Sequence, residues 1–172
     1  MKFLEKNLEQ IIWESDKQTL RKRGLELNGK LLRQVKIGNY GISDLICYER
    51  PRHICNVKYN PDGIIKVFEL KKDKISVETF LQAVRYVKGI KSYLNFRDSK
   101  IKNCSFEIVL IGSSIDLDTS FCYLTDFTED YNFNVKFYTY EYGIDGLFFI
   151  NKKDFKLKDE GFKIKDKKKY IF

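Results

Sequence analysis

Proline and glycine are scarce in this sequence, with 2 and 10 among its 172 residues. A chain that poor in both residue types is unlike a disordered or linker-rich protein. No apolar run is long enough to cross a bilayer, and the first residues lack the charged and apolar regions of a secretory signal. We therefore expect a soluble protein that forms one domain of ordinary size.

Histidine occurs once, as His53, and none of the four cysteines lies in a CxxC motif. A zinc site of the usual spacing needs more such ligands, so the sequence does not predict one. Reduced, mostly buried cysteines are typical of cytosolic proteins, and we expect a cytoplasmic location. Basic residues exceed acidic ones, which gives a net charge of +8. This charge favours a polyanionic partner such as nucleic acid, although many basic domains are merely soluble.

Hydrophobic periodicity predicts a mixed α/β domain over residues 1–150, built around a central sheet. The expected order is a helix, a β-hairpin, a strand, a helix, a strand, a helix and two final strands. In residue numbers these are 3–14, the hairpin within 31–49, then 64–70, 77–93, 105–112, 113–130, 134–142 and 146–150. Residues 151–172 alternate apolar residues with lysines, which predicts a short hairpin that belongs to the same domain.

The strand that ends in "VFELKKDK" carries Glu69 and Lys71 two residues apart, and therefore on one face. Asp44 interrupts the preceding apolar strand in the same way. An unpaired buried carboxylate is costly, so these acids need compensation. They suit a hard divalent cation with oxygen ligands, with the lysine as a charge partner for water or phosphate. A structural ion pair at the sheet edge is the alternative.

Two helices supply further polar candidates. Gln82 and Tyr86 are four apart on one helix face. We expect them to lie away from the apolar stripe, which consists of Val77, Phe80, Leu81, Val84 and Val87. On the first helix, Glu5 borders the apolar arc more closely than Glu9 does and so points toward the strands. Ordinary solvated side chains are the alternative for these residues.

In this order, Asp44, "ELK" at 69–71 and "QAVRY" at 82–86 resemble the PD-(D/E)XK nuclease superfamily, in its QxxxY variant. The nuclease domain of NucS/EndoMS-type endonucleases is similar over roughly residues 3–95, with a leading glutamate at Glu5 and "GISD" at 41–44. Ser43 stands where the motif has its proline. The resemblance implies a restriction-endonuclease-like sheet flanked by helices and a DNA endonuclease that depends on Mg²⁺ or Mn²⁺.

The resemblance also implies a role for each residue of the motif. Asp44 and Glu69 would be metal ligands, joined by the backbone carbonyl of Leu70. Lys71 would orient the attacking water and stabilise the developing charge. Glu5 would assist the metal site, and the side chains that would line the cleft are Gln82 and Tyr86.

DNA is the expected partner, and a homodimer is considered beside a monomer. The residues predicted to contact phosphates are Arg33, Lys72, Lys156, Lys158, Lys163 and Lys165. A solvated basic terminus is the alternative for the last four. Two other functions stay open on the same fold. One is a structure-selective nuclease of the Holliday-resolvase or repair-exonuclease type, and the other is a nucleic-acid-binding or inhibitor protein that does not cut.

Overall fold

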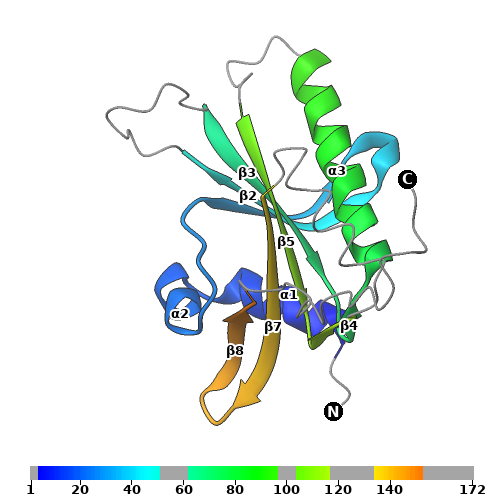
Figure 1. The fold of residues 1–172 in the computed structure, drawn as a ribbon. Coiled ribbons are helices and arrows are strands. Elements are labelled where there is room, and N and C mark those ends of the chain that lie inside the picture. The colour runs from blue at the N-terminus through cyan, green and yellow to red at the C-terminus, as the bar shows by residue number, and fades with distance from the viewer. Residues whose placement is uncertain (1–3, 51–61, 97–103, 117–133, 153–172) are drawn as a thin grey trace, which may run out of the picture.

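The computed structural model describes residues 4–50, 62–96, 104–116 and 134–152 (Figure 1). The helices are α1 (Glu5–Glu14), α2 (Lys17–Lys22), the 3-10 turn η1 (Gly38–Tyr40) and α3 (Val77–Phe96). The strands are β1 (Lys30–Lys36), β2 (Ile42–Glu49), β3 (Gly63–Leu70), β4 (Lys74–Ile75), β5 (Cys104–Gly112), β6 (Ser114–Ile115), β7 (Asn134–Gly143) and β8 (Gly146–Asn151).

A six-stranded sheet in the order β1-β2-β3-β5-β7-β8 forms the centre of the domain. Strands β3, β5 and β7 are parallel, while the β1–β2, β2–β3 and β7–β8 pairs are antiparallel. The short strands β4 and β6 form a separate parallel pair. The predicted mixed α/β class, with helices flanking a central sheet, is therefore confirmed.

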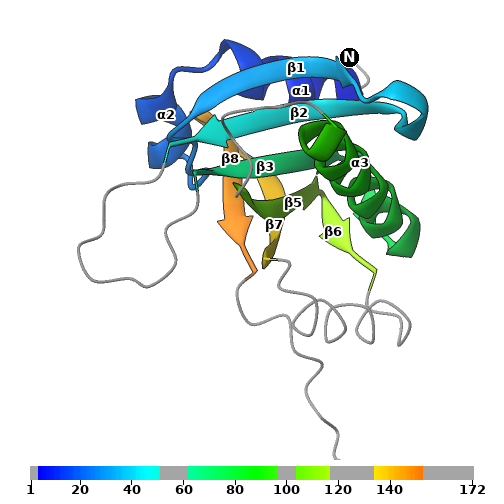
Figure 2. The same ribbon diagram turned by 90° about the horizontal axis from the view of Figure 1, so that it is seen from above.

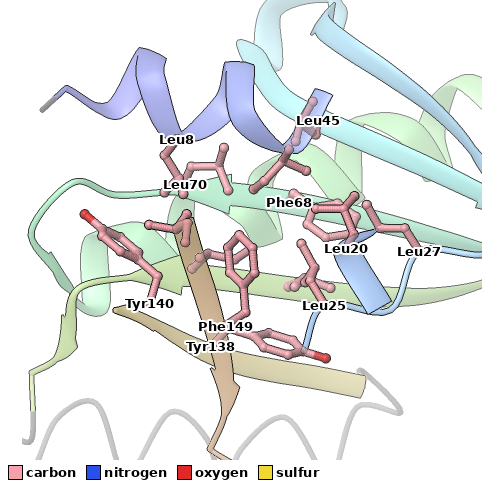
Figure 3. Packing of buried hydrophobic residues seen from close by; sticks show 14 of the residues in the cluster. Leu8, Leu20, Leu25, Leu27, Leu45, Phe68, Leu70, Tyr138, Tyr140 and Phe149 are labelled. Atoms are coloured by element: carbon pink, nitrogen blue, oxygen red, sulfur yellow. The ribbon is translucent and has the colours of Figure 1, made fainter. Parts of the chain in front are cut away.

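Each face of the sheet is covered by its own helices (Figure 2). On one face, Leu8 and Ile12 of α1 and Leu20 of α2 pack against the strands, and Figure 3 shows this core from close by. On the other face, α3 contributes Phe80 and Val87. The alternation of side chains along each strand sends successive residues to these two cores.

The parallel centre of the sheet decides where functional groups meet. Helix α3 lies between β3 and β5 in the chain and crosses back over the sheet, as a parallel connection requires. The carboxyl ends of β3, β5 and β7 therefore lie at one edge, with Leu70 level with Ile111 and Ile111 level with Tyr138. Glu69 is carried to this edge by β3, and α1 begins there on the neighbouring core.

The predicted hairpin within 31–49 and the predicted strands agree with the structure, while two expectations about helices differ from it. Leu81, which was expected in the apolar stripe of α3, is 51% exposed, because Ala83 and Tyr86 turn the buried face away from it. Residues 114–115 of the predicted helix 113–130 form strand β6, and the helix beyond residue 116 lies outside the described residues. The predicted tail hairpin lies almost wholly in 153–172, also outside them. No helix within the described ranges has the length and apolarity needed to cross a membrane.

A row of buried charges crosses the opposite face of β3 from Glu69. Lys66 donates to Glu49 at 2.8 Å and lies 3.6 Å from Glu107, and its side chain is almost fully buried. Glu107 also pairs with Lys136 at 3.0 Å. Burial lowers the pKa of Lys66, but the hydrogen bond that Lys66 donates to Glu49 and the charges of Glu49 and Glu107 outweigh this effect and raise the pKa. Lys66 therefore stays charged in the core.

Replacing Lys66 by alanine is expected to destabilise the fold by roughly 2–3 kcal/mol, because two acids lose a buried counter-charge while Lys136 still neutralises one of them. Urea unfolding measures this loss. The matched control is Lys36→Ala, at an exposed position of β1, which should change stability by less than about 0.5 kcal/mol. Equal effects of the two substitutions would show that the buried row adds no stability.

Candidate functional site

Glu69 is the most deeply buried acid at the carboxyl edge of the parallel strands. Its side chain is about 2% exposed, and its Oε1 accepts a hydrogen bond from Lys71 Nζ at 2.8 Å. Its Oε2 is buried and has no hydrogen-bond partner in the described part of the chain. An unpartnered buried carboxylate oxygen costs free energy, so this atom calls for a further positive group or donor.

Asp44 lies beside Glu69 because of the register between β2 and β3. Leu45 pairs with Phe68, so continuing this antiparallel register places Asp44 opposite Glu69, on the same face of the sheet. Asp44 Oδ2 accepts a hydrogen bond from the backbone N–H of Leu70 at 2.9 Å. Ser43, in the position of the motif's proline, is buried and donates from its hydroxyl to the carbonyl of Leu45 at 3.2 Å.

Glu5, the first residue of α1, completes the group from the other side of the sheet edge. Its Oε1 lies 3.7 Å from Lys71 Nζ, and its side chain is 46% exposed. Lys71 therefore lies between a buried acid and an acid that reaches solvent. The structure thus brings together all four of the predicted residues Glu5, Asp44, Glu69 and Lys71.

Glu69 and Asp44 both have raised pKa values, and burial is the main cause for each. Burial, followed by the charge of Asp44, raises the pKa of Glu69 to about 7, although Lys71 opposes the shift. Burial raises the pKa of Asp44 to about 6, although the Leu70 N–H opposes it and the charge of Glu5 adds to it. Burial lowers the pKa of Lys71, but the hydrogen bond to Glu69 and the charges of the nearby acids outweigh this effect. The pKa of Lys71 is therefore raised. A single lysine does not offset these acids.

Helix α3 places Gln82 and Tyr86 differently from the prediction. Tyr86 is 2% exposed and belongs to the core under α3, so its assignment to a polar face was wrong. The side chain of Gln82 donates to the Tyr86 hydroxyl at 2.7 Å, which satisfies the buried phenol. Gly41 adopts a φ of +117°, and a Cβ there would come within 2.9 Å of the Tyr86 ring. The glycine of "GISD" is thus explained by its close approach to Tyr86.

The prediction that Glu5 borders the packed face more closely than Glu9 was wrong, because Glu9 is 5% exposed while the side chain of Glu5 is 46% exposed. Sequence reasoning missed Glu9 as part of the site. Its carboxylate accepts hydrogen bonds from Arg33 and from the side chain of Gln34. Gln34 has a φ of +49° and lies opposite Asp44, where the β1–β2 pairing skips one pair. The charge of Glu9 also raises the pKa of Asp44. The register break and a glutamine in left-handed conformation leave no signal in the sequence.

The predicted phosphate contacts have mixed environments. Arg33 is paired with Glu9 and is 29% exposed, so its guanidinium is not held ready for a phosphate. Lys72 lies next to the site, 3.8 Å from Asp73, and its backbone carbonyl accepts from the Tyr140 hydroxyl. The lysines of the tail, Lys156, Lys158, Lys163 and Lys165, lie outside the described residues. Phosphate binding by any of these residues stays a prediction.

The donor atoms at this edge fit a hard divalent cation. Mg²⁺ and Mn²⁺ take oxygen ligands and commonly use one or two carboxylates together with water. Asp44 and Glu69 supply two carboxylates, and Glu69 Oε2 has no hydrogen-bond partner within the described ranges. Within the described residues, no three or more His, Cys, Asp or Glu side chains gather as a metal site. A cation here would therefore rely on backbone and water oxygens as well.

Models of known protein families, curated proteins and solved structures were compared with this chain, and none of them matches it. The interpretation of the site therefore depends on its own geometry and on the motif resemblance.

The raised pKa values predict how the stability of the metal-free protein depends on pH. Between the usual carboxyl pKa near 4 and the raised values of about 6 and 7, the folded protein holds protons that the unfolded chain releases. These two acids therefore make the fold less stable as pH rises through that window. Glu69→Gln should remove much of this loss, so the variant should gain in melting temperature relative to wild type at pH 8 but not at pH 5. Thermal melts in EDTA measure the difference, and parallel curves for both proteins would contradict it.

Proposed function

We propose that this chain is a metal-dependent DNA endonuclease that hydrolyses phosphodiester bonds. The observation that carries the proposal is Glu69 Oε2, which is buried and has no hydrogen-bond partner among the described residues, beside Asp44 and Lys71 where the parallel strands β3 and β5 end. Two acids whose pKa values are raised by burial and by the charges of neighbouring acids favour a cation between them. The order of these residues in the PD-(D/E)XK pattern supports DNA as the substrate.

In the proposed reaction, a water oxygen attacks the phosphorus and the bond from phosphorus to the leaving oxygen breaks. One proton leaves the water, and the leaving oxygen takes up a proton. A divalent cation supplies positive charge that stabilises the extra negative charge of the phosphate. Asp44 and Glu69, with the backbone carbonyl of Leu70, would hold it.

The residues of the chain would position the other reactants. Lys71 is held by Glu69 at 2.8 Å, so its ammonium group is fixed where it can bind a phosphate oxygen or orient the water. Glu5 lies 3.7 Å from the same ammonium and is half exposed, which suits contact with the site through water. Gln82 donates a hydrogen bond to the Tyr86 hydroxyl and so fixes the Tyr86 ring, which lies between α3 and Gly41.

The state of the described cysteines fits a location inside the cell. Cys47 and Cys104 are free thiols in the structure, and Cys47 is buried. Reduced cysteines are the rule in the cytoplasm. We propose a cytoplasmic location for the protein.

Asp44→Ala, Glu69→Ala and Lys71→Ala are each expected to reduce cleavage by a factor on the order of 10³ or more, because each removes a group that acts on the reacting phosphate. The assay is nicking of supercoiled plasmid DNA with Mg²⁺ or Mn²⁺, with EDTA as the blank. Glu14→Ala, at the exposed end of α1, is the matched control and should keep full activity. Thermal melts check that each variant folds. Full activity of Asp44→Ala or Glu69→Ala would exclude the assignment.

Mg²⁺ or Mn²⁺ is expected to stabilise the wild-type protein but not Asp44→Asn. At a concentration ten times the dissociation constant, one bound ion contributes about 1.4 kcal/mol, or about 4 °C in melting temperature for a chain of this size. Binding should be weak without DNA, since few protein ligands are present. Calorimetry that shows tight, stoichiometric zinc binding lost on mutating cysteines would contradict an oxygen-ligand site.

A further inference from the structure

Tyr140 is a buried tyrosine of β7 whose hydroxyl reaches the loop that begins with Lys71. It is 6% exposed and belongs to the core that α1 and α2 cover. Its hydroxyl donates a hydrogen bond to the backbone carbonyl of Lys72, which lies 68 residues away in the chain. Figure 3 shows the ring in this core, with its hydroxyl directed toward the loop that follows β3. A core side chain from a distant strand therefore holds the backbone beside the candidate site.

The register of β7 explains how Tyr140 reaches this loop past β5. Thr139 pairs with Gly112, the last residue of β5, so Tyr140 lies one residue beyond the pairing. A Cβ at Gly112 would come within 2.8 Å of the carbonyl oxygen of Asp73, so the glycine lets the loop approach the end of β5. Tyr140 therefore contacts the loop after β3, although β5 lies between β3 and β7 in the sheet.

Three hydrogen bonds hold consecutive residues of this loop. The N–H of Lys71 donates to the carbonyl of Ile111 at 2.8 Å. The N–H of Ser113 donates to the carbonyl of Asp73 at 2.8 Å. Both of these bonds join backbone atoms, so side-chain substitutions leave their donors and acceptors in place. The third bond comes from the Tyr140 hydroxyl and holds the residue between the other two. Of the three bonds, this one depends on the identity of a side chain.

The ammonium group of Lys71 depends on the position of this loop. It lies 2.8 Å from Glu69 Oε1 and 3.7 Å from Glu5 Oε1. Glu69 belongs to β3 and Glu5 to α1, so the two acids are fixed by different elements. Because Lys71 follows the last residue of β3, the loop backbone decides where its side chain starts. A shift of that backbone would change both distances.

The Tyr140 hydroxyl keeps its proton and so remains a hydrogen-bond donor. Burial is the main cause that raises its pKa to about 12, and the charges of Tyr142, Asp73 and Glu5 add to the shift. At neutral pH the group is therefore protonated. Glu5 also contributes to the raised pKa of Lys71, so the tyrosine and the lysine share this acidic neighbour.

We propose that Tyr140 is a positioning residue that holds the backbone at Lys72 and thereby fixes the ammonium group of Lys71. That group then stays within reach of Glu69 and Glu5, where it acts on the phosphate or the water. The catalytic consequence of this inference rests on the proposed nuclease function. Tyr140 itself acts through the loop backbone and touches neither the phosphate nor the cation.

Tyr138 provides a matched control on the same strand. It lies two residues before Tyr140, is 5% exposed and belongs to the same core. Its hydroxyl accepts a hydrogen bond from Asn151 Nδ2 of β8 at 3.5 Å. Figure 3 shows the two hydroxyl groups pointing in different directions. Phenylalanine at either position removes one hydroxyl and keeps the ring, so both variants should fold, and thermal melts check this.

Hydrogen exchange in the metal-free protein tests the positioning without any cleavage. NMR in EDTA follows the amides of Lys71 and Ser113. Tyr140→Phe should speed their exchange roughly 5-fold, as the loss of one hydrogen bond predicts. It should also shift or broaden the proton–nitrogen signal of the Lys71 ammonium group, which is assigned by its loss in Lys71→Arg. Tyr138→Phe should change neither. Equal effects of the two substitutions, or no effect of Tyr140→Phe, would overturn the inference.

Steady-state nicking of plasmid DNA with Mg²⁺ measures the catalytic consequence. Tyr140→Phe should lower kcat roughly 10-fold, as is typical of residues that orient catalytic groups, and leave KM within about 2-fold of wild type. Tyr138→Phe should keep the wild-type kcat. A raised KM with an unchanged kcat would contradict a positioning role, since it would place Tyr140 in DNA binding instead.

The two measurements separate this inference from the proposed function. If wild-type protein cuts no DNA, but exchange at Lys71 and Ser113 rises only in Tyr140→Phe, the nuclease function fails while the positioning stands. If wild-type protein cuts DNA and Tyr140→Phe matches its kcat, the nuclease function stands and the inference fails.

Discussion

The burial of Glu69 next to Asp44 is the constraint on which the candidate site depends. Two carboxylates at the end of adjacent strands repel each other, and burial raises both pKa values. Lys71 satisfies only one oxygen of Glu69, and the other stays without a hydrogen-bond partner among the described residues. A structure that served stability alone would gain by replacing such a group with an apolar one. The arrangement therefore supports the proposed cation.

The rest of the fold serves to hold these acids in place. The parallel β3–α3–β5 connection brings Glu69 to an edge where α1 also begins, so Glu5 reaches Lys71 from a separate core. The N–H of Leu70 fixes Asp44, and Gly41 leaves room for the Tyr86 ring behind it. The same edge receives the β7–β8 hairpin through the Tyr140 contact with Lys72.

The two faces of β3 differ in how their buried charges are paired. On the face opposite Glu69, Lys66 is surrounded by Glu49 and Glu107, so the charges there are balanced within the chain. At the edge, the charges of Glu69 and Asp44 are not balanced. The contrast separates a buried ion network that is balanced within the chain from the acids at the edge, and it supports the proposed cation site.

The sequence by itself determined the α/β class, most strand positions and the grouping of Asp44, Glu69 and Lys71, because these follow from local periodicity and from spacing along one strand. Tertiary structure alone decided the rest. Tyr86 lies in the core because its ring packs against Gly41, although helical periodicity placed it on the polar face of α3. Glu9 pairs with Arg33 because the skipped pair at Gln34 directs the side chains of Arg33 and Gln34 toward α1. Such choices depend on contacts between residues far apart in the chain, which no local pattern contains.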